Sequence, residues 1–233
     1  MPYYYGFDAT YILVLIGVVI SLLASAKLKS TYAKYSEVRS LSGLTGAQAA
    51  ERILYAQGIY DVTVEHIDGE LTDHYDPSAK VLRLSDNVYD CTSVAAVGVA
   101  AHECGHAIQH AKSYTPLKIR TAIVPVATIG AKVAWPLIIV GLIIGSSGSN
   151  FLITLGILMF SLSVLFQIVT LPVEFNASSR AVTALSEMGI LYGDEVKGTK
   201  KVLSAAALTY VAAAASAILQ LLRLLLLFGR RDD

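Results

Sequence analysis

The apolar residues of this chain are gathered into long blocks that polar stretches separate. Three blocks, at 9–26, 121–145 and 151–171, approach or exceed the ~20 residues that a helix needs to cross a bilayer. A fourth apolar stretch, at 202–222, is rich in alanine, and we expect it to span as well, with a buried or re-entrant helix pair as the alternative. The pattern predicts a mainly α-helical, multi-pass membrane protein, with 1–233 as a single domain.

A polar segment at 27–120 separates the first apolar block from the second. Lys27, Lys29 and Lys34 follow the first block, whereas no lysine or arginine precedes it. Because lysine and arginine collect on the cytoplasmic side of a membrane, this asymmetry indicates an uncleaved anchor. It also predicts that the polar segment is a small globular portion facing the cytoplasm.

Local patterns in the polar parts predict a small α+β fold. Valines alternate with polar residues at 62–64, as in a half-buried strand. Residues 71–84 predict a β-hairpin, because an Asp-Pro-Ser turn sequence lies at its centre. A helix is expected at about 92–112, ending before a nearby proline. A second polar helix is expected at 173–191, where Pro172 fits the first helical turn.

The composition agrees with a membrane location. Of all residues, 55% are hydrophobic and 15% are charged, and the mean hydropathy is +0.58. Soluble domains carry about 25% charged residues, so much of this chain faces something other than water. The net charge is zero, which argues against a nucleic-acid partner because such partners require a basic surface. Cys91 and Cys104 form no Cys-x-x-Cys pair, and we interpret them as reduced packing cysteines.

The predicted helix at 92–112 carries His102-Glu103-Cys104-Gly105-His106, a match to the pattern His-Glu-x-x-His. At about 100° per residue, the two histidines lie about 40° apart on one helix face, one turn from each other. Their imidazoles can therefore bind one metal ion at ~2.0–2.1 Å. The pattern predicts one catalytic Zn²⁺ held by His102 and His106, the alternative being two structural histidines on an amphipathic helix.

Glu103 is predicted to be the general base of such a site. Its carboxylate lies beside the ligand face, where it can take a proton from a metal-bound water as that water attacks a peptide carbonyl. Zinc lowers the pKa of its bound water from 15.7 to about 7, so hydroxide is available at neutral pH. The motif therefore predicts peptide-bond hydrolysis.

A catalytic zinc needs a third protein ligand and an open position. The candidates are Glu174, His110, His74, His66 and Asp90. His110 continues the row of histidines, but three residues spread over about 80° of one rigid helix cannot converge on a small ion. We expect His110 beside the ligands, on the substrate side, or simply at a polar helix end. Glu174 fits equally well as a ligand or as a carboxylate favoured at a helix N-terminus.

Four stretches of the chain resemble the YugP family of bacterial membrane zinc metallopeptidases. They lie at 71–77, 82–85, 99–109 and 172–178, and they include the His-Glu-x-x-His motif and the later Glu-Phe-Asn-Ala-Ser sequence. The resemblance covers nearly the whole chain, including the order of its apolar segments. The layout is also similar to that of HtpX and the CAAX prenyl proteases.

This resemblance implies roles for further residues. Glu174 matches the third zinc ligand, and Ser178 stands where the HtpX-type pattern has an aspartate that orients a zinc histidine. In such peptidases an edge strand beside the zinc pairs with the extended substrate, and Val81-Leu82-Arg83-Leu84 is the matching candidate, an ordinary hairpin strand being the alternative. His74, on the partner strand, is a candidate donor to the oxyanion of the tetrahedral intermediate.

The sequence therefore predicts a zinc endopeptidase in the bacterial cytoplasmic (inner) membrane, with a zincin-like α+β portion and its site on the cytoplasmic side. By similarity to HtpX-like quality-control proteases, the expected substrates are membrane or membrane-proximal polypeptides. Membrane lipid is an expected partner, and a larger membrane complex is a conceivable one. The alternative is a non-catalytic, zinc-stabilised scaffold or adaptor, which a fourth protein ligand on the metal would favour.

Overall fold

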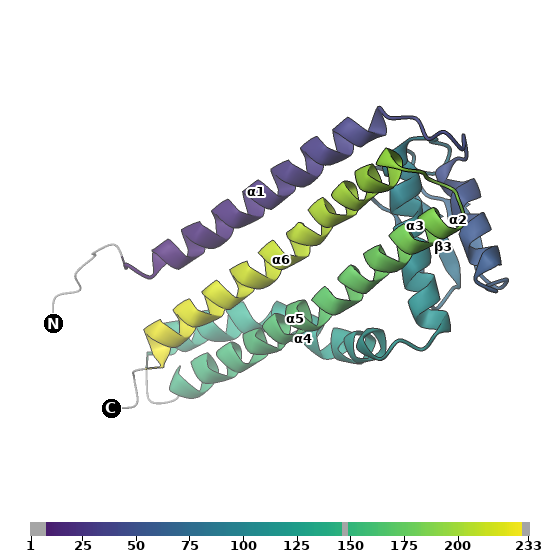
Figure 1. The fold of residues 1–233 in the computed structure, drawn as a ribbon. Helices are drawn as coiled ribbons and strands as arrows, with labels where there is room; N and C mark the ends of the chain where they lie inside the picture. The colour runs from purple at the N-terminus through teal and green to yellow at the C-terminus, as the bar shows by residue number, and fades with distance from the viewer. Residues whose placement is uncertain (1–7, 146–148, 230–233) are drawn as a thin grey trace. The chain divides into compact units, whose positions relative to one another are not determined.

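The computed structural model of the chain describes residues 8–145 and 149–229. Four of its helices are long and apolar enough to cross a membrane (Figure 1). They are α1 (Tyr11–Ser36), α4 (Thr115–Ile144), α5 (Ser149–Glu187) and α6 (Asp194–Phe228). The fourth apolar stretch lies within α6, which is one uninterrupted helix, so the alternative of a re-entrant helix pair is wrong.

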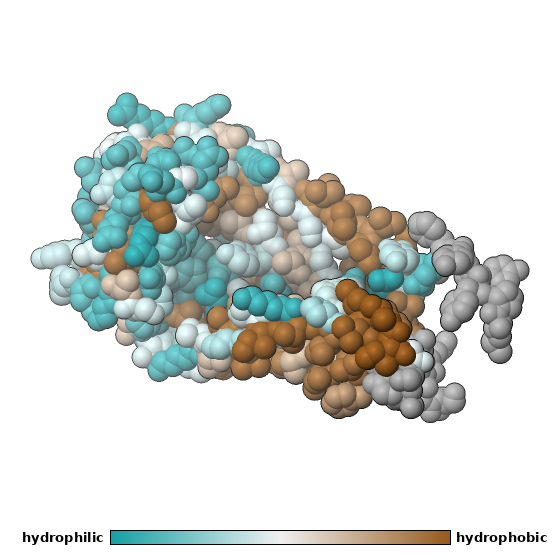
Figure 2. All heavy atoms as spheres, turned by 180° about the vertical axis from the view of Figure 1, so that it is seen from behind, coloured by the Kyte–Doolittle hydropathy of each residue, from teal (hydrophilic) through white to brown (hydrophobic). Residues whose placement is uncertain are grey.

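Residue contacts divide the chain into two compact units, each made of segments that lie far apart in the sequence. The first unit combines Met1–Ala24, Ile119–Thr170 and Thr209–Asp233, and the second combines Ser25–Lys118 and Leu171–Leu208. On the face shown in Figure 2, hydrophobic residues cover helices of the first unit, and hydrophilic residues cover much of the second. All predicted site residues belong to the second unit.

Within the first unit, small residues let α1 and α6 approach each other closely. A Cβ added at Gly17 would lie 3.1 Å from Ser216 Oγ, so a larger residue there would crowd the neighbouring helix. The same serine donates a hydrogen bond to the Gly17 carbonyl at 2.9 Å and lies 3.0 Å from Ser21 Oγ. Close approach with hydroxyl contacts is typical of helix packing in membranes.

The second unit is built around a three-stranded sheet in the order β1-β3-β2. Strand β3 (Val81–Leu84) pairs in parallel with β1 (Thr63–His66) and antiparallel with β2 (His74–Asp76). The predicted hairpin is therefore present, but the prediction that Val81-Leu82-Arg83-Leu84 is an edge strand is wrong. Both sides of β3 already pair with other strands, so it has no free edge for a substrate, and β2 is the edge strand of the hairpin.

Two helices cover the sheet and form the core with it. Helix α2 (Gly46–Ala56) begins at a capping box of Thr45 and Gln48, and α3 (Val94–Ala111) begins at the N-cap Ser93. Most of α3 is alanine, glycine and valine, so its neighbours can pack directly on its backbone. Its bounds agree with the helix predicted at about 92–112.

The structure corrects the prediction that a separate helix starts at Pro172. Helix α5 runs without a break from Ser149 to Glu187, so Pro172 lies in its interior and not in a first turn. Glu174 is therefore far from a helix N-terminus, and the macrodipole explanation for this carboxylate fails. Prolines are tolerated inside membrane helices where neighbouring groups satisfy the freed backbone.

A glycine of the histidine motif sets the distance between α3 and α5. A Cβ added at Gly105 would lie 2.4 Å from the Ala177 carbonyl oxygen and 3.0 Å from two further backbone atoms of that residue. Because these are backbone atoms, they cannot rotate away, and any side chain at position 105 would push the helices apart. This close approach brings Glu174 of α5 beside His102 and His106 of α3.

Candidate metal centre

Helix α3 presents the two histidines of the motif to one carboxylate of α5. The Nε2 atoms of His102 and His106 lie 3.3 Å and 3.6 Å from Oε2 of Glu174. A tetrahedral zinc with ligands at ~2.0–2.1 Å holds neighbouring ligand atoms roughly 3.3–3.4 Å apart. These three atoms can therefore bind one zinc ion, and the residues fit the metal that the motif predicts.

The carboxylate of Glu174 has the environment of a metal ligand. Its side chain is 3% exposed, and Oε2 is buried with no hydrogen-bond partner within 8–145 and 149–229. The two imidazole nitrogens are close, but they do not make hydrogen bonds of good geometry to it. Burying an unpaired charge is costly, and a cation bound between the three side chains would remove that cost.

The same carboxylates affect the protonation of His106. Burial by itself would lower the pKa of this imidazole, but the carboxylates of Glu174 and Glu103 outweigh burial and raise that pKa above its usual value. A metal ion must displace this proton to bind, so we expect zinc affinity to fall in acid.

A buried glutamine fixes the orientation of His106. Gln109 Nε2 donates to the Val173 carbonyl at 2.8 Å and to Asn176 Oδ1 at 3.0 Å. Both partners are acceptors, so the other amide atom, Oε1, must face His106 Nδ1 at 3.1 Å. Nδ1 therefore carries the hydrogen, and the Nε2 lone pair is left for the metal. Sequence reasoning missed Gln109, although its position three residues after His106 on the same helix was a usable signal.

The other histidine has a hydroxyl partner from α5. Ser178 Oγ lies 3.2 Å from His102 Nδ1, one helical turn after Glu174. A hydroxyl can accept the Nδ1–H hydrogen and so leave Nε2 for a metal. The residue that replaces the expected aspartate thus still contacts the histidine, but it brings no charge.

Replacing Gln109 by methionine should weaken zinc binding. The two side chains are similar in volume, but methionine cannot accept the His106 Nδ1–H hydrogen bond, so the imidazole loses its fixed tautomer and orientation. We expect zinc affinity to fall by roughly 10–100-fold, the usual cost of losing a partner of a metal-bound histidine. Competition with a fluorescent chelator measures this, with Gln57→Met at the exposed end of α2 as the control. An unchanged affinity in Gln109→Met would contradict the assigned role.

The predicted general base lies against the free edge of the sheet. The Tyr75 backbone N–H in β2 donates a hydrogen bond to Glu103 Oε2 at 3.0 Å, and the Glu103 side chain is almost buried. The phenol of Tyr75 lies 2.9 Å from His110 Nδ1, two turns further along α3. Tyr75 thus joins β2 to the helix at two places. The observed contact of His110 is with this strand and not with His102, His106 or Glu174, so of the places predicted for it the substrate side and the polar helix end fit this contact.

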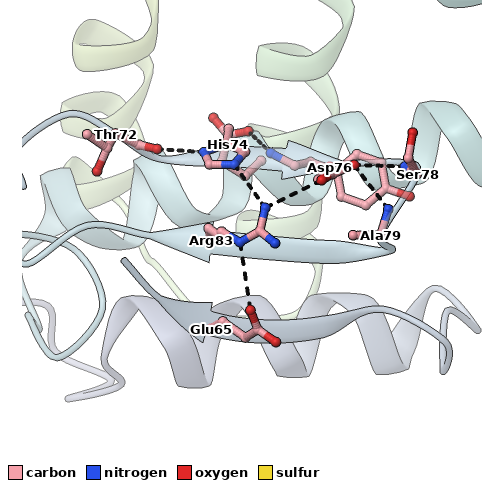
Figure 3. A network of polar contacts seen from close by, with 9 residues as sticks. Glu65, Thr72, His74, Asp76, Ser78, Ala79 and Arg83 are labelled. Atoms are coloured by element: carbon pink, nitrogen blue, oxygen red, sulfur yellow. Dashed lines mark hydrogen bonds and ion pairs between the residues drawn. The ribbon is translucent and has the colours of Figure 1, made fainter. Parts of the chain in front are cut away.

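The structure also contradicts the prediction that His74 stabilises an oxyanion. His74 Nδ1 lies 2.7 Å from the Thr72 carbonyl, which accepts its hydrogen, and Nε2 lies 3.3 Å from Arg83 Nη1, a donor (Figure 3). Both ring nitrogens are therefore engaged, and no N–H remains for a substrate. Successive side chains of a strand point to opposite faces, so His74 and the neighbouring Tyr75, which contacts α3, belong to different faces of β2.

Arg83 is the centre of this second network. Its guanidinium also lies 3.4 Å from Asp76 Oδ2 and 3.7 Å from Glu65 Oε2, so it links all three strands (Figure 3). Hydrogen bonds from the backbone of Ser78 and Ala79, together with Arg83, lower the pKa of the Asp76 carboxyl. The network supports the sheet, and none of its described contacts includes a ligand of the metal centre.

The remaining third-ligand candidates lie elsewhere. His66 pairs with Asp86 at 2.6 Å in an exposed cluster that also includes Asp68. Asp90 is exposed and has no place in either group of possible metal ligands among the described residues. Cys104 is fully buried and contacts the Ala50 carbonyl, away from the histidines, and burial raises the pKa of its thiol.

The pocket of two histidines and a glutamate, the adjacent Glu103, and four helices that could cross a membrane are together typical of membrane zinc metallopeptidases. Residues 10–229 match the model of the family described as "Putative neutral zinc metallopeptidase", and the chain belongs to this family. It is 50% identical to "Putative membrane protease YugP" of Bacillus subtilis (strain 168) over 215 residues, which are 92% of this chain and 94% of that protein. No solved structure matches the chain. The predicted family and fold class are confirmed.

Proposed function

We propose that this protein is a membrane-embedded zinc endopeptidase with one catalytic Zn²⁺ bound by His102, His106 and Glu174. The observation that carries the proposal is the convergence of three ligand atoms, one of them a buried carboxylate oxygen that has no hydrogen-bond partner among the described residues, beside a fourth residue able to move protons. Three protein ligands leave one tetrahedral position open, as in catalytic zinc sites. A purely structural site is usually closed by a fourth protein ligand.

In this proposal the ion, when bound, supplies Lewis acidity that lowers the pKa of a water molecule to about 7. Glu103 takes a proton from the attacking water and delivers it to the leaving amine. The Tyr75 N–H holds one oxygen of this carboxylate, which limits its rotation and directs the other oxygen. Gln109 and Ser178 hold the two imidazoles so that their Nε2 atoms face the ion.

The strand that binds the substrate is proposed to be β2. One side of β2 pairs with β3, and Tyr75, on the other side, directs its N–H to Glu103. An extended peptide added along this free edge would lie beside the general base, and main-chain hydrogen bonds would hold it. Substrates are proposed to be membrane or membrane-proximal polypeptides, cleaved on the cytoplasmic side as in protein quality control.

Metal removal and return test the proposal. The full chain in detergent micelles, stripped with a zinc chelator and dialysed, should cleave no internally quenched peptide. Addition of one equivalent of Zn²⁺ should restore cleavage, because three ligands and an open position are already in place. Fluorescence release and mass spectrometry of the products measure the result, with Mg²⁺ as the control ion. Protein that binds one zinc but cleaves none of a broad set of membrane-derived peptides would refute the endopeptidase assignment.

A further inference from the structure

A cavity of about 820 Å³ in the second unit lies away from the metal centre and is lined by five lysines. Lys27 and Lys34 come from α1, and Lys197, Lys200 and Lys201 come from α6. Among the residues that the structure describes, no acidic residue lines it, and the one carboxylate paired with these lysines is the exposed Asp194, at 2.8 Å from Lys197 Nζ. Five lysines against one nearby carboxylate give the surroundings of the cavity a net positive charge, so the cavity favours an anion.

The two walls of this cavity are fixed by packing in the second unit. A Cβ added at Gly198 would lie 2.7 Å from the ring of Tyr35, so the aromatic ring of α1 rests directly on the backbone of α6. The neighbouring Thr199 donates a hydrogen bond to the Val94 carbonyl at 3.2 Å, which anchors the same turn of α6 on α3. The lysines are therefore carried by elements held together before any ligand binds.

The remaining lining residues match a phosphate group and hydrocarbon. Thr31 and Ser204 add hydroxyls that can donate hydrogen bonds to phosphate oxygens, whereas the Ser30 hydroxyl already donates to the Lys27 carbonyl at 3.1 Å. Ala205 and Leu208 lie further along α6, where its sequence becomes apolar. The charged part and the apolar part of the cavity thus follow each other along one helix.

The position along the chain also matches a lipid headgroup. The apolar part of α1 ends just before Lys27, and the apolar part of α6 begins just after Lys201. Both sets of lysines therefore stand at the polar ends of candidate membrane spans, the level at which phospholipid phosphates lie. Basic pockets at such positions bind anionic headgroups.

We propose that this cavity binds the phosphate of an anionic phospholipid, with the five lysines around the phosphate and the acyl chains along the apolar end. The shared chemistry is a phosphate group, so free phosphate is the other source to be distinguished. The proposal does not depend on the peptidase assignment, because its test measures binding and not hydrolysis.

Lipid titration of the full chain in neutral detergent micelles tests the proposal. The test variant is Lys34→Gln/Lys200→Gln/Lys201→Gln, and the control variant is Lys29→Gln/Arg52→Gln/Lys112→Gln, which removes the same charge at exposed positions outside the cavity. Native mass spectrometry measures the binding of phosphatidylglycerol and of phosphatidylcholine, two lipids with identical acyl chains, to each protein. We expect the wild type and the control variant to bind phosphatidylglycerol saturably and in preference to phosphatidylcholine. The test variant should bind phosphatidylglycerol roughly 100-fold more weakly than the wild type.

The other arms separate the sources of phosphate. Binding of phosphatidylglycerol that millimolar inorganic phosphate does not displace supports a lipid, whereas binding of inorganic phosphate without preference for the anionic lipid overturns the lipid assignment. Equal binding of both lipids, or an equal loss in test and control variants, overturns the site itself. If the glutamine variant does not fold, Lys34→Arg/Lys200→Arg/Lys201→Arg should retain binding, and wild-type binding should weaken as salt is raised. Binding that is insensitive to salt contradicts the proposal.

Discussion

Glu103→Gln should bind zinc like the wild type and lose hydrolysis by roughly 10²–10⁴-fold, the range that general acid–base catalysis contributes. The substitution keeps the shape of the side chain, and its amide oxygen can still accept the Tyr75 N–H that holds the carboxylate now. It cannot accept a proton from water. The three proposed metal ligands are unchanged, so the chemical step should fail and the metal site should survive.

Parallel measurements of zinc content and of quenched-peptide cleavage separate these effects. Glu51→Gln, on the exposed side of α2, is the matched control and should cleave normally. A Glu103→Gln protein that cleaves at the wild-type rate would show that another group moves the proton. A variant that loses its zinc would show that Glu103 belongs to the ligand set.

Glu174→Gln should lower zinc affinity by more than ~100-fold, beyond the usual effect of residues that only support a ligand. The substitution replaces an anionic oxygen with a neutral amide at the point where the two imidazoles converge. In the variant, the two neutral imidazoles remain, but no ligand supplies the negative charge that the buried carboxylate contributes in the wild type. Peptide cleavage should fall with zinc occupancy.

Chelator competition gives the affinity, and thermal unfolding gives an independent measurement. A ligand that binds only the folded state raises its stability by RT ln(1 + L/Kd), where L is the free ligand concentration, so at one zinc concentration zinc should stabilise the wild type and much less the variant. Glu187→Gln, at the exposed end of the same helix, is the control. Equal stabilisation of the variant and the wild type by zinc would remove Glu174 from the site.

The metal centre combines one local element with one long-range contact. The histidine pair needs only the helical repeat of α3, because residues four apart share a face. The third ligand needs α5 to lie against α3, and Gly105 allows this because its missing Cβ leaves room for the Ala177 carbonyl. Gly105 occupies one of the two x positions of His-Glu-x-x-His, where the motif specifies no residue type, and it lets the two helices approach each other.

The strand assignments show where local patterns stop being informative. The hairpin of β2 and β3 was predictable, because a turn sequence separates two extended stretches that lie close in the chain. The parallel pairing of β1 with β3 was not predictable from local patterns. Alternation of apolar and polar residues predicts that each segment is a strand, but not which strand it pairs with. Because β1 pairs with the second side of β3, only β2 of the two hairpin strands keeps a free edge, and β2 is therefore the proposed substrate strand.

Side-chain roles beside the metal depended on contacts that spacing does not specify. Histidines suit a catalytic site, but the hydrogen bonds of His74 are with Thr72 and Arg83. The hydrogen bond of His110 is with Tyr75. Gln109 drew no prediction, because its spacing of three residues from His106 suggests a contact but does not specify which other groups hold its amide. Its role appears only when the Val173 carbonyl of α5 is in place.

The sequence by itself determined the apolar helices, the α+β character of the polar part and the pairing of His102 with His106. These follow from hydropathy and from fixed helical geometry, both of which act over a few residues to a few turns. The tertiary structure decided that Glu174 lies against His102 and His106, that Pro172 lies within a continuous helix and that β2, not β3, is an edge strand. These features depend on which distant segments pack together, and the free energy of such packing is distributed over the whole second unit.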